Sequence, residues 1–86
     1  MARSFQLKVV TPEGIAVEAD VESLVLPGAA GSLGVLASHE PWTVLLKQGA
    51  VSWKKVAGAW ESFDIAAGVA QIEGTSTTVL ADSKVK

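Results

Sequence analysis

The residues that most resemble catalytic groups in this 86-residue chain are Ser38, His39 and Glu40, which are adjacent in the sequence. A serine activated by a histidine is the nucleophile of many hydrolases. Adjacent residues of an extended segment point in alternating directions, however, so Ser38 and His39 do not share a face. The chain has no second histidine and no G-x-S-x-G turn. We therefore expect no catalytic residue, and we expect His39 to make a local hydrogen bond or to contact a partner protein.

Metal binding is the second chemistry to consider. One histidine and no cysteine leave only carboxylates as ligands. Glu18, Asp20 and Glu22 alternate along one predicted strand, about 7 Å apart from one to the next. This spacing predicts a solvated acidic strand face, so we expect no metal and no cofactor.

A phosphate-binding loop is the third possibility, because Gly28, Gly31 and Gly34 lie within seven residues. No Lys-Ser or Lys-Thr pair follows them, and no helix is predicted to begin there. The pattern instead predicts a tight turn between two short apolar strands. Glycines so closely spaced predict backbone at positive φ, or backbone close to a neighbour.

The composition is that of one globular domain, which we place at residues 1–86. Hydrophobic residues make up 49% of the chain, there are eight glycines and no cysteine, and the net charge is −2. The acidic balance lacks the basic footprint of a nucleic-acid-binding protein. The first residues lack the apolar block of a signal peptide.

Alternation of apolar and polar residues predicts strands over almost the whole chain. They are expected at residues 4–11, 15–22, 24–26, 33–36, 42–46, 51–54, 60–66, 69–72 and 77–81. Turn signals about every 8–12 residues are typical of an all-β protein. We therefore predict a β-sandwich or barrel. At Ser23 the alternation changes phase, which indicates either a bulge or the start of a new strand.

Three tryptophans, Trp42, Trp53 and Trp60, are large for so small a chain. Packing in the core or at its rim explains most of them. Trp42 follows the Gly-rich and His39 loops and is the strongest candidate for a partner contact. Trp60 lies beside a predicted hairpin tip, where exposure is expected. By elimination, the residues favour a binding or structural role.

Several stretches follow one another in the order and spacing of a known family. They are FQLKVVTPE at residues 5–13, VESLVLPG at 21–28, GSLGVL at 31–36, His39 with Pro41, AAGV at 66–69 and TVLAD at 78–82. The set resembles the epsilon subunit of F-type ATP synthases, called delta in mitochondria. That family's central signature reads V-E-S-x-x-x-P-G followed by G-x-L-G-I-L.

The resemblance implies a two-layer β-sandwich, or flattened barrel, of about ten short antiparallel strands. It also implies a non-catalytic central-stalk rotor subunit, which couples the gamma shaft to the membrane c-ring so that proton flow drives ATP synthesis. It implies gamma and the c-ring as partners, without nucleic acid, cofactor or small-molecule substrate. The implied location is peripheral, on the cytoplasmic face of the bacterial inner membrane, with membrane association only through the complex. A free-standing β-sandwich adaptor for another protein is the alternative.

The resemblance also assigns candidate contact residues. The gamma-interface candidates are Thr11, His39, Trp42 and Val44, where Trp42 replaces the usual leucine. The c-ring-interface candidates are Ala29, Ala30, Gly31 and Ser32. The family commonly has carboxylates in this loop, as E-G-E-L-G, and here Ala30 and Ser32 stand instead. Family members usually continue into a C-terminal helical hairpin, which we expect to be absent from this chain.

Overall fold

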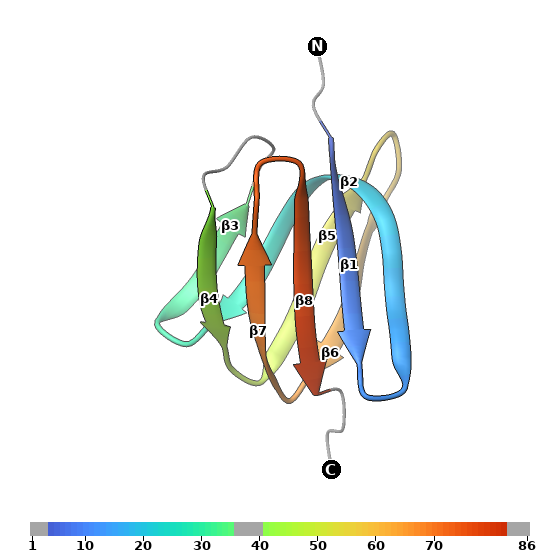
Figure 1. The fold of residues 1–86 in the computed structure, drawn as a ribbon. Helices are drawn as coiled ribbons and strands as arrows, with labels where there is room; N and C mark the ends of the chain where they lie inside the picture. Colours follow the sequence, from blue (N-terminus) through green and yellow to red (C-terminus); the bar gives the residue numbers. More distant parts are fainter. Residues whose placement is uncertain (1–3, 36–40, 83–86) are drawn as a thin grey trace.

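The computed structural model describes residues 4–35 and 41–82, and this part of the chain forms eight strands (Figure 1). They are β1 (Phe5–Thr11), β2 (Gly14–Gly28), β3 (Gly31–Val35), β4 (Trp42–Leu46), β5 (Gly49–Lys55), β6 (Trp60–Ile65), β7 (Ala67–Ile72) and β8 (Ser76–Asp82). The all-β prediction is confirmed. None of the described residues forms a helix that is long and apolar enough to span a membrane.

The strands make one sheet that folds over into two layers. Its hydrogen-bonded order is β1-β8-β7-β4-β2-β5-β6, with β3 also paired to β2 and with β1 closing back onto β2. In Figure 1 the strands β4, β7, β8 and β1 form one layer, in front of β3, β5 and β6. We call these the first and second layers. The predicted two-layer sandwich is therefore confirmed.

The long strand β2 belongs to both layers. Its first half pairs with β1, and its second half pairs with β3 and β5. The register against β5 shifts between Val21 and Ser23, where the sequence changes phase. The bulge is thus the correct interpretation, and residues 15–22 and 24–26 are one strand. Counting them separately is one reason why the predicted number of about ten strands exceeds the eight observed.

One pairing departs from the antiparallel prediction. β1 and β8 run parallel, from Gln6 opposite Ser76 to Val10 opposite Leu80. A parallel pair needs a long connection, and here all the other strands supply it. Alternation alone cannot reveal strand direction, so the sequence carried no sign of this pair.

The core lies between the layers and consists of the inward-facing residue of each alternating pair. Leu7, Leu26, Ile65 and Ile72 are among its fully buried side chains. Among the described residues, fifteen hydrophobic side chains are buried, and they form one contiguous cluster. Trp53 belongs to this core, whereas Trp42 and Trp60 are exposed. The expectations for Trp53 and Trp60 are confirmed.

The sequence predicted that Gly28, Gly31 and Gly34 have backbone at positive φ or close to a neighbour, and this holds for the first two. Gly31 has a φ of 137°, a conformation that side-chain-bearing residues rarely adopt. A Cβ atom added to Gly28 would lie 2.6 Å from the carbonyl oxygen of Gly31. A Cβ on Gly34 would meet nothing within 4 Å, and its backbone is not in the positive-φ region. Gly34 is therefore no tight-turn residue, contrary to expectation.

Candidate interaction surfaces

The described residues offer two surfaces for contact with a partner. Within residues 4–35 and 41–82, no three His, Cys, Asp or Glu side chains are grouped so that they could hold a metal ion. His39, which we predicted to make a local hydrogen bond or to contact a partner, lies outside the described residues. The site must therefore be sought in the shape and polarity of the surface.

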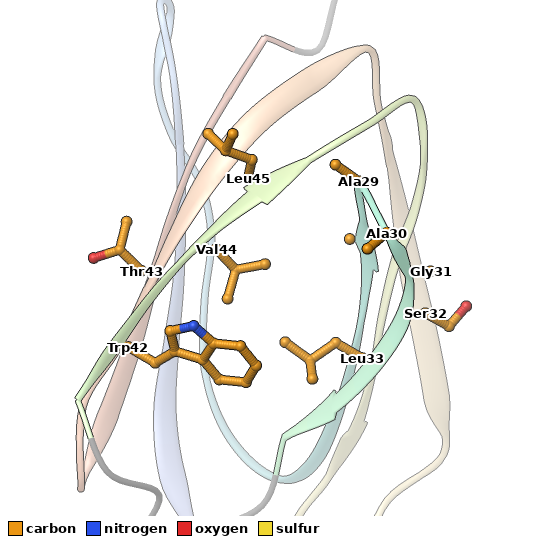
Figure 2. Close-up of a pocket in the computed structure, with 10 residues that line it drawn as sticks. Ala29, Ala30, Gly31, Ser32, Leu33, Trp42, Thr43, Val44 and Leu45 are labelled. Atoms are coloured by element: carbon orange, nitrogen blue, oxygen red, sulfur yellow. The ribbon is translucent and has the colours of Figure 1, made fainter.

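The first surface is a groove between β4 and the β2–β3 turn, with a cavity of about 410 Å³ (Figure 2). We call it the edge groove. Residues 28–33 line one side and residues 42–45 line the other. None of these ten residues carries a charge. A cavity of this size and polarity falls within the range of ordinary binding sites.

Two backbone hydrogen bonds hold the closed end of the edge groove. The N–H of Ala29 donates to the carbonyl oxygen of Leu45 over 2.9 Å, and the N–H of Lys47 donates to that of Pro27 over 2.9 Å. At the same point Gly28 pairs with Leu46, the one register position shared by β2 and β4. The turn is thus fixed relative to β4, although the two segments come from different layers.

The groove brings together residues that the sequence assigned to two different partners. Figure 2 shows the side chains of Trp42 and Val44 pointing into the groove toward Leu33, while Thr43 and Ser32 point away. The predicted gamma candidates Trp42 and Val44 therefore lie opposite the predicted c-ring turn that contains Ala30. Trp42 remains 47% exposed, as a contact residue requires.

Thr11 lies apart from this group. It ends β1, which is separated from β4 by β8 and β7 in the sheet. Its hydroxyl donates to the carbonyl oxygen of Gly14 over 3.1 Å and accepts from the N–H of Glu13 over 3.2 Å. Thr11 thus stabilises the β1–β2 turn, whatever it contacts outside the domain.

The second surface was missed by the sequence. Five apolar side chains stand next to one another across the outer face of the first layer. Register pairs Ile15 with Val10, Val10 with Leu80, Leu80 with Val69 and Val69 with Leu45. Paired residues have their side chains on the same face. We call these five residues the apolar row.

The apolar row is exposed where most of the face is polar. Leu45 is 66% exposed, Ile15 57% and Leu80 53%. The row two residues away along the strands is polar throughout, and it consists of Glu18, Lys8, Thr78, Gln71 and Thr43. The apolar side chains are therefore confined to one band and do not cover the whole outer face of the first layer. Contiguous apolar patches of this kind mark contact sites.

The shortest ion pair among the described residues, between Lys54 and Glu22, lies where β2 crosses between layers. Lys54 Nζ donates to Glu22 Oε2 over 2.6 Å, and this hydrogen bond, with the attraction between the two charges, holds the pKa of Glu22 below its ordinary value of 4.5. Partial burial works in the opposite direction, and the backbone N–H of Ala57 lowers the pKa further. Glu22 is therefore not part of the solvated acidic face that its spacing from Glu18 and Asp20 predicts.

The sequence matches one family over residues 4–86, described as the beta-sandwich domain of the ATP synthase delta/epsilon chain. The chain is 39% identical over 85 residues to the ATP synthase epsilon chain of Mesorhizobium japonicum, covering 99% of this chain and 63% of that one. It is also 39% identical over 83 residues to the ATP synthase epsilon chain of Brucella abortus, covering 96% of this chain and 62% of that one. It thus spans less than two thirds of these relatives.

Two solved structures share the fold. A chain in the cryo-EM structure of the Euglena gracilis mitochondrial ATP synthase, showing OSCP, F1 and c-ring, matches with a TM-score of 0.84 at 19% identity, over 91% of this chain and 50% of that one. A chain in the central stalk and c-ring of the Tetrahymena thermophila mitochondrial ATP synthase matches with 0.73 at 11% identity, over 93% and 64%. With the family match over nearly all residues, the conclusion is that this chain belongs to the ATP synthase delta/epsilon-chain β-sandwich family.

Proposed function

We propose that this chain is a non-catalytic rotor subunit of an F-type ATP synthase, in which it joins the gamma subunit to the c-ring. The observation that carries the proposal is the apolar row, a band of apolar side chains across five neighbouring strand segments, in which Ile15, Leu80 and Leu45 are exposed and the other two are half-buried. We assign the row to gamma. The subunit then associates with the membrane only as a peripheral part of the complex.

A joint that transmits torque needs a rigid and broad contact, and it needs no reactive group. The apolar row meets this need because its side chains come from paired strands, whose spacing the ladder fixes. Behind it, inward-facing neighbours such as Val9, Val79 and Ala70 are fully buried. The core therefore supports the surface that gamma would press against.

The β2–β3 turn supports an assignment to the c-ring. It lies at one end of the sandwich, and two backbone hydrogen bonds and the positive φ of Gly31 hold its shape. Ala29, Ala30, Gly31 and Ser32 are all exposed. The side-chain polar contact from this turn is left to Ser32, so we expect the ring to meet a largely neutral surface here.

The test is binding of the gamma subunit from the same organism, measured by isothermal titration calorimetry. The variant Leu80→Asp places a charge in the middle of the apolar row, and we expect affinity to fall at least about tenfold, because a buried unpaired charge is costly. Thr78→Asp is the matched control, two residues away on the same strand and in the polar row.

Two results would overturn the proposal. Absence of wild-type binding to gamma at tens of micromolar would leave a free-standing adaptor as the better function. Equal effects of the Leu80 and Thr78 variants would remove the apolar row as the contact. Thermal unfolding of both variants must remain near that of the wild type for the comparison to count.

A further inference from the structure

The edge groove lies between two strand edges that have few or no partners in the described part of the chain. β3 pairs with β2 on one side only. β4 pairs with β7 along its length, and with β2 only where Gly28 meets Leu46. Open strand edges are templates for the addition of another extended segment.

The hydrogen bonds of β4 show which backbone groups face its open edge. The carbonyl of Leu45 and the N–H of Lys47 both point toward β2. Backbone groups of an antiparallel strand alternate in direction, so those of Thr43, two residues before Leu45, point to the same side. β2 ends at Gly28, opposite Leu46, so it does not extend as far as Thr43. Within the described residues, the N–H and C=O of Thr43 therefore face the groove side without a strand to receive them.

The opposite wall has the same property. Pro27 is paired in register with Ser32 of β3. Pro27 has no N–H to donate, however, and its carbonyl accepts a hydrogen bond from the N–H of Lys47. Pro27 and Ser32 therefore do not exchange backbone hydrogen bonds. The backbone groups of Ser32, and by alternation those of Gly34, then point away from β2. Both walls thus present backbone groups that have no strand partner among residues 4–35 and 41–82, beside an apolar cavity.

Charge and continuity restrict what can occupy this groove. The ten lining residues are uncharged, so a charged guest side chain would lose its hydration without gaining a partner. Leu45 lines the groove and also ends the apolar row. A protein that covers the row is therefore already at the mouth of the groove.

We propose that the edge groove receives a short, extended and uncharged segment of the protein that covers the apolar row, which pairs with β4 at Thr43. A guest residue that points inward then packs between Leu33, Trp42 and Val44 (Figure 2). This inference rests on the proposed function, because that function supplies the partner, gamma. It adds strand pairing to what would otherwise be contact between side chains alone.

Amide hydrogen exchange of the wild-type domain, free and bound to gamma, tests the pairing directly. Strand addition on β4 protects the Thr43 amide, whereas docking on the apolar row alone leaves it exchanging as in the free domain. Protection at Ser32 and Gly34 without protection at Thr43 would overturn the assignment to β4. This measurement needs no variant and so does not depend on how a substitution folds.

A proline pair gives the second test. Thr43→Pro removes an N–H that faces the open edge and leaves the ladder to β7 intact. Loss of one hydrogen bond predicts about tenfold weaker binding of gamma. Ser62→Pro is the control, because Ser62 lies on β6, the open edge strand of the second layer, where it pairs with Ser52 of β5 away from the groove.

The outcomes separate this inference from the function on which it rests. If gamma does not bind the wild type, the proposed function fails. A second outcome is that gamma binds the wild type, that Leu80→Asp weakens this binding, and that Thr43→Pro and Ser62→Pro have equal affinity for gamma. The rotor assignment then stands, and the groove inference is wrong. If a small uncharged apolar dye such as Nile red fills the groove equally well in the gamma complex, the groove is not occupied by a strand and the inference is also wrong.

Discussion

The two layers of this sandwich have outer faces of opposite character. Across the first layer, the outward residues at one level are large and apolar, ending in Leu45 at one side and Ile15 at the other. Across the second layer, one outward row consists of Gly34, Val25, Ser52 and Ser62, and the exposed Trp60 stands beside Lys54 in the next row. Both faces obey the same strand alternation, but the row of five apolar residues lies on the first layer.

The comparison shows why one exposed leucine is weak evidence for a contact site, whereas a row of apolar residues is strong evidence for one. Single apolar residues are common on protein surfaces and need no explanation. Five in register across neighbouring strands form a continuous band, which favours a covering partner. The row on the second face, in which Val25 is the one large apolar residue, gives a partner less apolar area to bury. Four predictions test this contrast, from the largest effect to the smallest.

The largest effect is expected from the inner side of the strands. Leu26 is fully buried, so Leu26→Ala should lower the free energy of unfolding by about 2–5 kcal/mol, through lost burial and the cavity left behind. Leu80→Ala, on the outer face, should change it by less than about 0.5 kcal/mol. Urea unfolding measures both. A large loss at Leu80 would mean that the apolar row stabilises the domain itself.

The next prediction compares the two outer faces in binding. Leu45→Ala should weaken binding of gamma by about tenfold, because it removes exposed apolar area at the junction of the row and the groove. Ser62→Ala, on the second face, should leave the affinity unchanged. Calorimetric titration of both variants decides this, and equal affinities would assign the interface to some other surface.

The third prediction concerns two glycines of the same strand, β3. Gly31→Ala should lower the free energy of unfolding by about 1–2 kcal/mol, because alanine is strained at a φ of 137°. Gly34→Ala should lie within about 0.5 kcal/mol of the wild type, since its added methyl meets nothing within 4 Å. Chemical unfolding of the pair is the measurement. Similar losses at both would contradict the assigned backbone geometry.

The smallest effect is a pH dependence at the crossing of β2. The pKa of Glu22 is lowered in the folded state, chiefly by the hydrogen bond from Lys54, so the unfolded state binds the proton more tightly. The resulting stability is present above the ordinary value of 4.5 and is lost as the pH falls through the lower folded value. Glu22→Gln should unfold at a lower temperature than the wild type at pH 7, and this difference should shrink toward pH 3. A difference independent of pH would contradict the ion pair.

Local patterns in the sequence predicted the strands well and the surfaces poorly. Residues 42–46 alternate, are rich in β-branched and aromatic side chains, and form β4 with the predicted bounds. The phase change at Ser23 located the bulge, because alternation records which face each residue occupies. These signals lie within a few residues of one another, so a single strand is enough to read them.

The surfaces depend on register between strands that are far apart in the sequence. Ile15, Val10 and Leu80 become neighbours only through the β1–β2 and β1–β8 pairings, and a bulge after Val9 is needed to place Ile15 opposite Val10. The edge groove likewise requires β2 to pass between layers. The family resemblance named Trp42, Val44 and Ala29–Ser32 as contacts of different partners, and their closeness in one groove appears only in three dimensions.

The parallel pairing of β1 and β8 has a mechanical consequence. Five residue pairs join these two strands, and the chain enters at one end of the domain and leaves β8 at the other (Figure 1). Tension applied along this axis loads the hydrogen bonds between β1 and β8 in shear, so they must yield together. A hairpin of neighbouring strands pulled from its open end would instead unzip one bond at a time. In the rotor role that we propose, this arrangement would resist being pulled open along the axis of β1 and β8.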